Sequence, residues 1–434
     1  MARDRETEVL VVGAGPVGLF TGLVLAGKGI QVEIVEEEWR STARSYALAL
    51  HPYSLKLLDD LGLARELIEK GHQLHALAFY QKGERQVQLS YTKLPSPFPF
   101  ILVLPQQALE EALVKRLKKK KVKVEWNHRV DAIESDSHGV RVHIQRLRKE
   151  VTGYAVAGTE WVVDKAFTSK ARFVVGADGH RSVVRRRLGI GFPEVAQPLL
   201  FAVFEFGAER LPEHEVRVVM DNGQTNVLWP MRGGRFRWSF QLESAAKFAD
   251  PRIKSRLAVQ VGGRSYPHLG KDELQQLIAE RAPWFDSPIR DVAWSIAVQF
   301  ESRLADSFGK DRVWMVGDSA HLANPVGVQS MNVGLREAHD LASLLADLLR
   351  SKDPFANLVP GEDARAGHDP LQEFNLKRLA EWSQLLGLEG APRPGDSAND
   401  WTSQHAPRIL PCIPASGEDL SLLLKQAGLE LTER

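Results

Sequence analysis

The N-terminal part of the chain contains the pattern that most restricts its fold. Val9–Val12 is a short run of apolar residues, which is typical of a parallel strand buried on both faces. A turn with the spacing G-x-G-x-x-G follows over Gly13–Gly18. After it come a helical pattern over Val17–Gly27 and a second strand over Gln31–Glu36. This strand–turn–helix–strand unit predicts a parallel α/β sheet whose first turn binds the phosphates of a dinucleotide.

Each residue of this turn has a physical task. Gly13 permits the tight bend, Gly15 lets the backbone approach a diphosphate, and Gly18 lets the helix pack closely on the strand. The helix opens at Pro16–Val17, where free N–H groups and the helix dipole favour negative charge. Glu36 ends the second strand and is placed to accept hydrogen bonds from a ribose hydroxyl. The pattern therefore favours dinucleotide binding, without distinguishing NAD from FAD.

A second turn carries a carboxylate directly after a buried strand. In the segment Gly176–Ser182 the strand ends close to Asp178, and a basic helical stretch follows. Asp178 either caps that helix or lies beside a diphosphate and a ribose. The residues alone leave both interpretations open.

The third turn has the same organisation. Gly317-Asp318 follows the strand Val313–Val316, and an irregular loop through Pro325 leads to a helix near Met331-Asn332. That arrangement presents a carboxylate and a row of free backbone amides to a ligand. The same carboxylate can also be a helix cap, and His321 an ordinary hydrogen-bonded core residue.

Size and composition indicate a globular protein of two or three domains. The chain has 434 residues, of which 44% are hydrophobic and 26% charged. The formal net charge of +1 gives no attraction to nucleic acid or to anionic membranes. No apolar run reaches the ~18 residues that a membrane helix needs. Cys412 is the only cysteine, and no residues stand at metal-ligand spacing. We therefore expect a cytoplasmic protein with no disulfide, no metal site and no integral membrane segment.

The patterns along the chain divide it into three parts. Aromatic-rich strand patterns such as Arg235–Phe240 dominate the middle of the sequence. Near the end, Ser416 and Asp419 are placed to form a capping box for a closing helix. We expect a discontinuous, Rossmann-like binding domain over 1–75, 100–189 and 301–350, a substrate domain built on a β-sheet over 76–99 and 190–300, and a C-terminal helical segment over 351–434.

Taken together and in this order, the three turns resemble one enzyme family. The G-x-G-x-x-G turn, Asp178-Gly179 and Gly317-Asp318 are similar to motifs of the FAD-dependent group A aromatic monooxygenases, the family of para-hydroxybenzoate hydroxylase and the ubiquinone-biosynthesis hydroxylases. The resemblance runs from about Val9 to about Leu349. It implies bound FAD, with NAD(P)H and molecular oxygen as co-substrates. It also implies hydroxylation of an electron-rich aromatic, polyketide or quinone-type molecule through a C4a-hydroperoxyflavin.

The resemblance assigns roles by position. Glu36 would hold the adenosine ribose, Asp178 would lie near the diphosphate, and Asp318 would bind the ribityl chain. Backbone amides near Met331 and Asn332 would face the pyrimidine edge of the flavin, where a helix N-terminus stabilises negative charge. The residues expected to contact FAD are Gly13, Gly15, Pro16, Val17, Gly18, Glu36, Arg44, Gln106, Asp178, Gly317, Asp318, Pro325, Val328, Met331 and Asn332.

Candidates for the substrate site come from the middle of the chain. Arg237 is the candidate catalytic residue, because its strand resembles one that faces the flavin in this family. Tyr46, Trp229, Trp238 and Phe240 are candidates for lining the substrate, and each of them is equally compatible with ordinary packing.

Two positions depart from the family pattern. The loop after Pro325 usually carries glycine where Val328 and Ser330 stand, and side chains there alter the backbone dihedrals beside the flavin. Two alternatives therefore stay open beside the monooxygenase. One is a flavin reductase or desaturase of the same fold that inserts no oxygen, and the other is a non-catalytic FAD-binding protein. The sequence does not indicate an oligomeric state.

Overall fold

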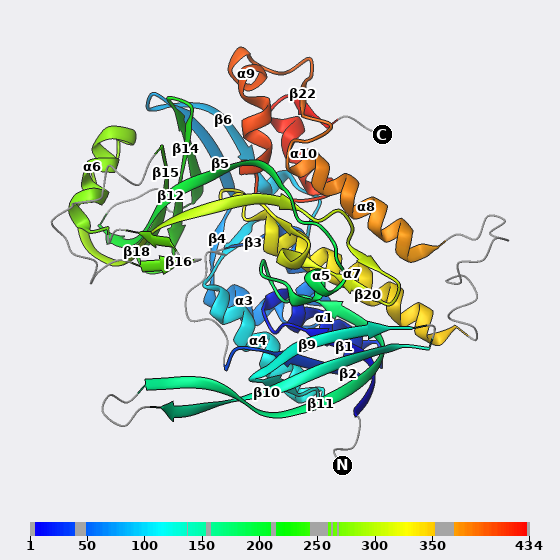
Figure 1. Ribbon diagram of the computed structural model, residues 1–434. Helices are drawn as coiled ribbons and strands as arrows, with labels where there is room; N and C mark the ends of the chain where they lie inside the picture. The colour runs from blue at the N-terminus through cyan, green and yellow to red at the C-terminus, as the bar shows by residue number, and fades with distance from the viewer. Residues whose placement is uncertain are drawn as a thin grey trace.

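Within residues 5–39, 49–136, 138–152, 158–209, 214–243, 259–261, 264–266, 269–351 and 369–431, which this computed structural model describes, two eight-stranded sheets organise the molecule. One sheet is mostly parallel and lies beside the N-terminus, and the other is mostly antiparallel (Figure 1). The C-terminal helices α8, α9 and α10 lie on the side of the molecule away from the N-terminus (Figure 1).

The mostly parallel sheet has the order β19-β20-β11-β1-β2-β8, and β10 and β9 extend it antiparallel to β11. Strands β20, β11, β1, β2 and β8 run in parallel, so their carboxyl ends lie at one edge. Helices α1 and α4 pack together beside it. Its strands are β1 (Arg5–Val12), β2 (Val32–Glu36), β8 (Val124–Trp126), β9 (His128–Ser135), β10 (Val140–Thr152), β11 (Gly158–Gly176), β19 (Gly309–Lys310) and β20 (Val313–Met315).

The second sheet has the order β21-β18-β12-β15-β14-β13-β5-β6 and is antiparallel apart from the pair β13 and β5. Strands β5 and β6 come from a segment far upstream of the others. They join the sheet through Glu215–Val219, which pairs with Ala76–Tyr80. Its strands are β5 (Ala76–Gln81), β6 (Glu84–Ser90), β12 (Glu194–Ala208), β13 (Glu215–Asp221), β14 (Gln224–Met231), β15 (Arg235–Leu242), β18 (Ile289–Leu304) and β21 (His321–Leu322).

Short sheets and helices complete the described part of the chain. The short strands are β3 (Ala49–Leu50), β4 (His72–Leu74), β7 (Ile101–Val103), β16 (Val259–Val261), β17 (Arg264–Tyr266), β22 (Arg393–Pro394) and β23 (Leu429–Glu430). The helices are α1 (Pro16–Gly27), α2 (Pro52–Asp60), α3 (Ala64–Lys70), α4 (Gln106–Lys119), α5 (Val183–Arg187), α6 (Lys271–Arg281), α7 (Gln329–Arg350), α8 (Pro370–Leu385), α9 (Asp400–Ile409) and α10 (Glu418–Gln426).

The antiparallel sheet separates two apolar cores. One face, with Phe201, Val203 and Trp229, belongs to the same continuous core as the parallel sheet. The other face packs against α6, and its cluster includes Trp238 and Phe240. Successive residues of a strand point to opposite faces, which explains why neighbours in the sequence belong to different cores.

The expected fold class is confirmed: a Rossmann-like unit, a second sheet and a C-terminal helical segment are all present. The domain boundaries themselves stay a prediction. One local prediction is wrong. The closing helix α10 is capped by Gly417, whose φ of 60° is left-handed, and no side chain caps it. Ser416 and Asp419 therefore form no capping box. Among the described helices, none is long and apolar enough to cross a membrane.

Candidate functional site

The three turns meet at one edge of the parallel sheet. Val12 at the end of β1 lies beside Gly176 of β11, and Gly176 lies beside Met315 of β20. On the other side of β1, Val12 pairs with Val35, one residue before Glu36. Parallel pairing therefore brings together segments that are more than 300 residues apart in the chain. Ligands of open parallel α/β sheets bind at this edge.

Close backbone packing explains the glycines of these turns. Gly13 has a φ of +106°, and a Cβ there would lie 2.3 Å from the carbonyl oxygen of Ala177. A Cβ on Gly18 would lie 2.1 Å from the carbonyl oxygen of Gly13. Gly15 is not closely packed, because a Cβ there would meet nothing within 4 Å. Two glycines are thus required by packing, and the third leaves open space where a diphosphate would approach.

A cleft of about 270 Å³ lies beside the first turn, between Gly13–Gly15, Glu36, Trp126 and Asp178. The Glu36 carboxylate accepts hydrogen bonds from the amides of Ala14 at 2.6 Å and Glu38 at 2.9 Å. Burial raises the pKa of Glu36, although these two amides act in the opposite direction. Glu36 thus lies at the wall of the cleft, and its role as acceptor for a ribose hydroxyl stays a prediction.

Asp178 takes the structural one of the two roles that the sequence left open, and its place beside a diphosphate stays a prediction. Its Oδ2 accepts hydrogen bonds from the amides of Val183 at 2.7 Å and Val184 at 3.1 Å, so it binds the first amides of α5, whose N-cap is Ser182. Its Oδ1 is buried and has no hydrogen-bond partner among the described residues. Burial raises the pKa of this carboxyl. Oδ2 therefore holds the start of α5, and Oδ1 is a buried acceptor without a hydrogen-bond donor.

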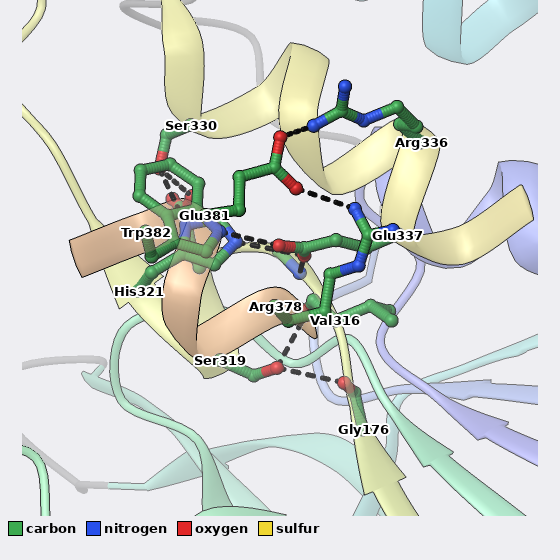
Figure 2. A network of polar contacts seen from close by, with 12 residues as sticks. Gly176, Val316, Ser319, His321, Ser330, Arg336, Glu337, Arg378, Glu381 and Trp382 are labelled. Carbon is green, nitrogen blue, oxygen red and sulfur yellow. Dashed lines mark hydrogen bonds and ion pairs between the residues drawn. The ribbon is translucent and has the colours of Figure 1, made fainter. Parts of the chain in front are cut away.

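In the third turn, Asp318 is exposed, while its neighbours Gly317 and Ser319 are buried. Gly317 has a φ of +66°, and its amide donates to the Oε2 of Glu337 at 2.9 Å. The exposed Asp318 accepts a hydrogen bond from the hydroxyl of Ser330 at 2.9 Å. Arg185 ties this turn to the second one by donating to the carbonyls of Ser319 at 2.6 Å and His180 at 2.9 Å. Ser319 also donates to the carbonyls of Gly176 and Val316, so hydrogen bonds join this turn to β11 (Figure 2).

The N-terminus of α7 has no side-chain cap. The first amides of a helix have no partner within the helix, so those of α7 are candidates for binding a ligand. The capping position is Val328, whose φ of 49° and ψ of 39° are left-handed. Valine is a rare choice there, because its branched Cβ crowds the backbone. The backbone at Val328 thus has a conformation that favours glycine, and the effect of its side chain on the backbone beside the flavin stays a prediction.

Hydrogen bonds of Asn332 and His51 hold the N-terminus of α7 against neighbouring segments. The side chain of Asn332 accepts from the amide of His51 at 2.8 Å and donates to the carbonyls of Ala49 at 2.9 Å and Val328 at 2.8 Å. The Nε2 of His51 lies 3.0 Å from the carbonyl of Gly327. A carbonyl only accepts, so Nε2 carries the proton. Burial lowers the pKa of His51 to about 3. Because the side chain of Asn332 is already used in these three hydrogen bonds, Asn332 can offer a ligand only its backbone.

Gln106 lies at the start of α4, where its side chain donates to Glu110 at 2.7 Å. Glu110 in turn lines the cleft beside the first turn. Two further candidates, Arg44 and Tyr46, fall outside the described residues.

The candidate substrate residues divide between the two faces of the antiparallel sheet. Trp229 and Arg237 are paired across β14 and β15, and Trp229 belongs to the core shared with the parallel sheet. Arg237 forms an ion pair with Glu205, with Nε 2.9 Å from Oε1. Trp238 and Phe240 stack on each other on the α6 side, with ring centroids 4.9 Å apart. The structure therefore does not bring these four residues together at one surface.

Three supporting residues were not recognised in the sequence. Glu337 lies on α7 between residues of its apolar stripe, and His51 has no motif around it. Arg185 belongs to the basic stretch after the second turn, but the pattern there indicates no role for it. Each makes contacts with segments that are distant in the chain, so no local pattern indicates its role. Among the described residues, no group of three or more His, Cys, Asp or Glu side chains could hold a metal ion.

The sequence around this sheet edge matches a known protein family. The model of a family described as "FAD binding domain" matches residues 6–358. The chain belongs to this FAD-binding family. The matched region contains all three turns, and it ends before α8.

Relatives with curated names are monooxygenases. The chain is 29% identical over 348 residues to "6-methylpretetramide 4-monooxygenase" of Streptomyces rimosus, a match that covers 79% of this chain and 56% of that protein. It is 23% identical over 391 residues to "Pentachlorophenol 4-monooxygenase" of Sphingobium chlorophenolicum, covering 88% of this chain and 64% of that protein. The matches thus span 56% and 64% of the length of these two relatives.

Solved structures agree on the fold. The crystal structure of p-nitrophenol 4-monooxygenase from Pseudomonas putida DLL-E4 has a TM-score of 0.66 and 22% sequence identity, over 98% of this chain and 94% of that one. At this identity the likeness concerns the fold alone. It extends across both large sheets and the C-terminal helices.

The residues present fit the FAD that this family binds. The space at Gly15, the partnerless oxygen of Asp178 and the exposed Asp318 follow one another along the sheet edge. The uncapped N-terminus of α7 lies beyond them. These are donors, acceptors and free space of the kinds that a diphosphate, a ribityl chain and a flavin ring need.

Proposed function

We propose that the chain is a FAD-dependent monooxygenase that uses NAD(P)H and molecular oxygen to hydroxylate an electron-rich small molecule. The observation that carries the proposal is the meeting of three ligand-facing turns at one sheet edge, in a member of a FAD-binding family. The names of two relatives, which act on pentachlorophenol and 6-methylpretetramide, support an aromatic or polyketide-type substrate. The single cysteine supports a cytoplasmic location.

The cofactor would lie along the edge from Glu36 to α7. Glu36 would accept hydrogen bonds from the adenosine ribose, while Gly15 and the N-terminus of α1 would face the diphosphate. Asp318 would accept from the ribityl hydroxyls. The backbone amides at the start of α7, near Met331, would stabilise negative charge at the pyrimidine edge of the flavin. Asn332 would keep that helix end in place through its bonds to Ala49 and Val328.

Bound FAD supplies the redox chemistry, because it accepts hydride from NAD(P)H and activates oxygen so that one atom enters the substrate and the other leaves as water. The protein would position the substrate and keep water from the reacting atoms. We propose that the substrate lies between the flavin end of the edge and the sheet face of Trp229 and Arg237. Arg237 would orient a polar group of the substrate, with Glu205 fixing its guanidinium.

An oxygen-labelling experiment tests this function. The purified protein is loaded with FAD and screened with phenols, quinone precursors and polyketides for faster NAD(P)H oxidation. With an accelerating compound, the reaction is repeated under isotopically labelled oxygen gas, and we expect one labelled atom in the product. Product without label would assign the chain to reductases or desaturases of the same fold. A protein that binds FAD but never oxidises NAD(P)H would be a non-catalytic FAD-binding protein.

A further inference from the structure

A buried carboxylate joins three segments behind the Gly317-Asp318 turn. Glu337 of α7 has no exposed surface, and its Oε2 accepts from the amide of Gly317 and from Nε2 of His321, each at 2.9 Å. Its Oε1 accepts from the indole nitrogen of Trp382 on α8 at 2.6 Å. Figure 2 shows the carboxylate between these donors. All donors converge on Glu337, so a change in any one of them affects the others.

The charge of Glu337 fixes the direction of these hydrogen bonds. Burial raises the pKa of Glu337, but His321, Arg378 and the Gly317 amide outweigh that effect and leave the pKa below its ordinary value. An ionised carboxylate only accepts hydrogen bonds, so Nε2 of His321 carries a proton and points at it. The other ring nitrogen, Nδ1, then faces the hydroxyl of Ser330 at 3.5 Å.

Ser330 continues this chain of contacts to the exposed carboxylate. Its hydroxyl lies 2.9 Å from Oδ1 of Asp318 and donates its one proton to it. Toward His321 the hydroxyl can therefore only accept, so this contact is a hydrogen bond when Nδ1 also carries a proton. Glycine at this position could not make this bond. Four hydrogen-bonding side chains, Trp382, Glu337, His321 and Ser330, therefore connect α8 with the Asp318 carboxylate.

Helix α8, which carries Trp382, is held against α7 and His321 by stacking and by ion pairs. The rings of Trp382 and His321 are stacked with centroids 3.7 Å apart and an interplanar angle of 20°. Arg378, which is almost fully buried, pairs with Asp340 of α7 at 2.6 Å and with Glu381 at 2.7 Å. Glu381 also pairs with Arg336 of α7 (Figure 2). These ion pairs hold α8 in register with α7, and the stacked indole holds the plane of the imidazole.

The C-terminal segment also touches the site at a second place. A Cβ on Gly327 would lie 2.5 Å from the carbonyl oxygen of Pro411, so the loop before α7 packs directly on this segment. Both contacts come from residues beyond 358, where the family match ends. The C-terminal segment therefore contributes to a site whose motifs all lie outside it.

We propose that Trp382, Glu337, His321 and Ser330 are positioning residues that orient the Asp318 carboxylate toward the ribityl chain, and that α8 is thereby part of the FAD site. The inference rests on the proposed function, in which Asp318 contacts FAD. None of the four residues needs to touch the cofactor.

Matched variants of the full-length protein test the proposal. Trp382→Phe keeps the stacking on His321 and removes the indole donor, and Ser330→Ala removes the hydroxyl. Ser330→Thr restores a hydroxyl. The control is Trp401→Phe. Trp401 also donates its indole N–H, in this case to Gln81 at 2.9 Å, and its ring stacks on His405 with centroids 4.5 Å apart. It lies on α9 instead of α8. The measurements are the FAD dissociation constant, the absorption spectrum of the bound flavin and the melting temperature.

We expect Trp382→Phe and Ser330→Ala each to raise the FAD dissociation constant about fivefold, the effect of one hydrogen bond of about 1 kcal/mol, and to shift the bound-flavin spectrum. Ser330→Thr should stay within about twofold of the wild type, and the effects of Ser330→Ala and Trp382→Phe should be less than additive in the double variant, because they act through one set of contacts. Trp401→Phe should lower the melting temperature and leave FAD binding unchanged.

Two results would overturn the proposal. One is wild-type affinity and an unchanged spectrum in both Trp382→Phe and Ser330→Ala. The other is an equal loss of affinity in Trp401→Phe, which would reduce the effect to general destabilisation. Failure of the wild-type protein to bind FAD would instead contradict the proposed function, so the two failures are distinguishable.

Discussion

At the scale of single residues, Val328 and His51 show how this chain holds the N-terminus of α7. Val328 occupies a left-handed backbone position, which costs a β-branched residue about 1–2 kcal/mol. The conformation persists because the residues on both sides are fixed. Asn332 binds the carbonyl of Val328, and His51 lies at hydrogen-bonding distance from the carbonyl of Gly327. The strain is therefore located directly beside the proposed flavin ring.

Glycine and alanine at position 328 separate backbone strain from side-chain packing. Both Val328→Gly and Val328→Ala remove most of the buried side chain, and only glycine adopts a φ of 49° without crowding. We expect the glycine variant to be more stable than the alanine variant by roughly 1 kcal/mol in the free energy of unfolding, measured by denaturant titration. An alanine variant of equal or greater stability would show that position 328 is not held in the left-handed region.

His51 makes the folded protein sensitive to acid. Its pKa is about 3 in the folded chain against an ordinary 6.5, so the unfolded chain binds the proton first as the pH falls. Stability is therefore lost below pH 6.5, and from pH 7 to pH 5.5 the loss from His51 is about 1 kcal/mol. His51→Gln keeps a donor for the Gly327 carbonyl and should flatten this part of the pH profile. The exposed control His138→Gln should keep it, and equal profiles for His51→Gln and wild type would refute the assignment.

At the scale of elements, two close approaches of α7 hold the site together. Helix α7 lies against the Gly317 turn and against α1, and a Cβ on Gly334 would be 2.9 Å from Cα of Gly317 and 3.0 Å from Cγ2 of Val17. Those contacts set the spacing between the first and third turns. Glycine inside a helix is otherwise unfavourable, so its presence here is explained by packing.

Alanine substitutions in two helices distinguish packing from helix propensity. Gly334→Ala should destabilise the protein by about 1–3 kcal/mol and weaken FAD binding, because α7 must move away from the Gly317 turn. Gly27→Ala at the end of α1 is the control, since nothing lies within 4 Å of its Cβ, and it should be neutral or stabilising by up to ~1 kcal/mol. Melting temperature and FAD titration are the measurements. Equal effects of the two substitutions would contradict the packing argument.

The elements also show which features can be predicted from sequence. The three turns were recognisable because each is a local pattern of strand, glycine and carboxylate. Arg237 and Trp238 were expected at one substrate site, although neighbours on a strand point to opposite faces, and the structure separates Trp229 from Trp238. Contacts such as Glu337 with Trp382, or Asn332 with His51, join residues that are 45 and 281 positions apart. No local pattern contains them, so they required the structure.

At the scale of the whole molecule, one continuous core joins the parallel sheet, one face of the antiparallel sheet and the C-terminal helices. The fold class followed from the sequence because alternating strands and helices predict a parallel sheet. The contribution of the C-terminal segment did not, because its helices look like ordinary packing elements until they meet α7. The molecule thus supports the proposed FAD site from three separate parts of the chain.

A titration of the purified protein with FAD and with FMN tests the central claim most directly. The cleft at Gly13–Gly15 and Glu36 would hold the half of FAD that FMN lacks. We predict one bound FAD per chain and FMN affinity at least ~100-fold lower, which corresponds to about 2.7 kcal/mol. Equal affinity for FMN, or no binding of either flavin, would contradict an extended FAD site along the edge of the parallel sheet.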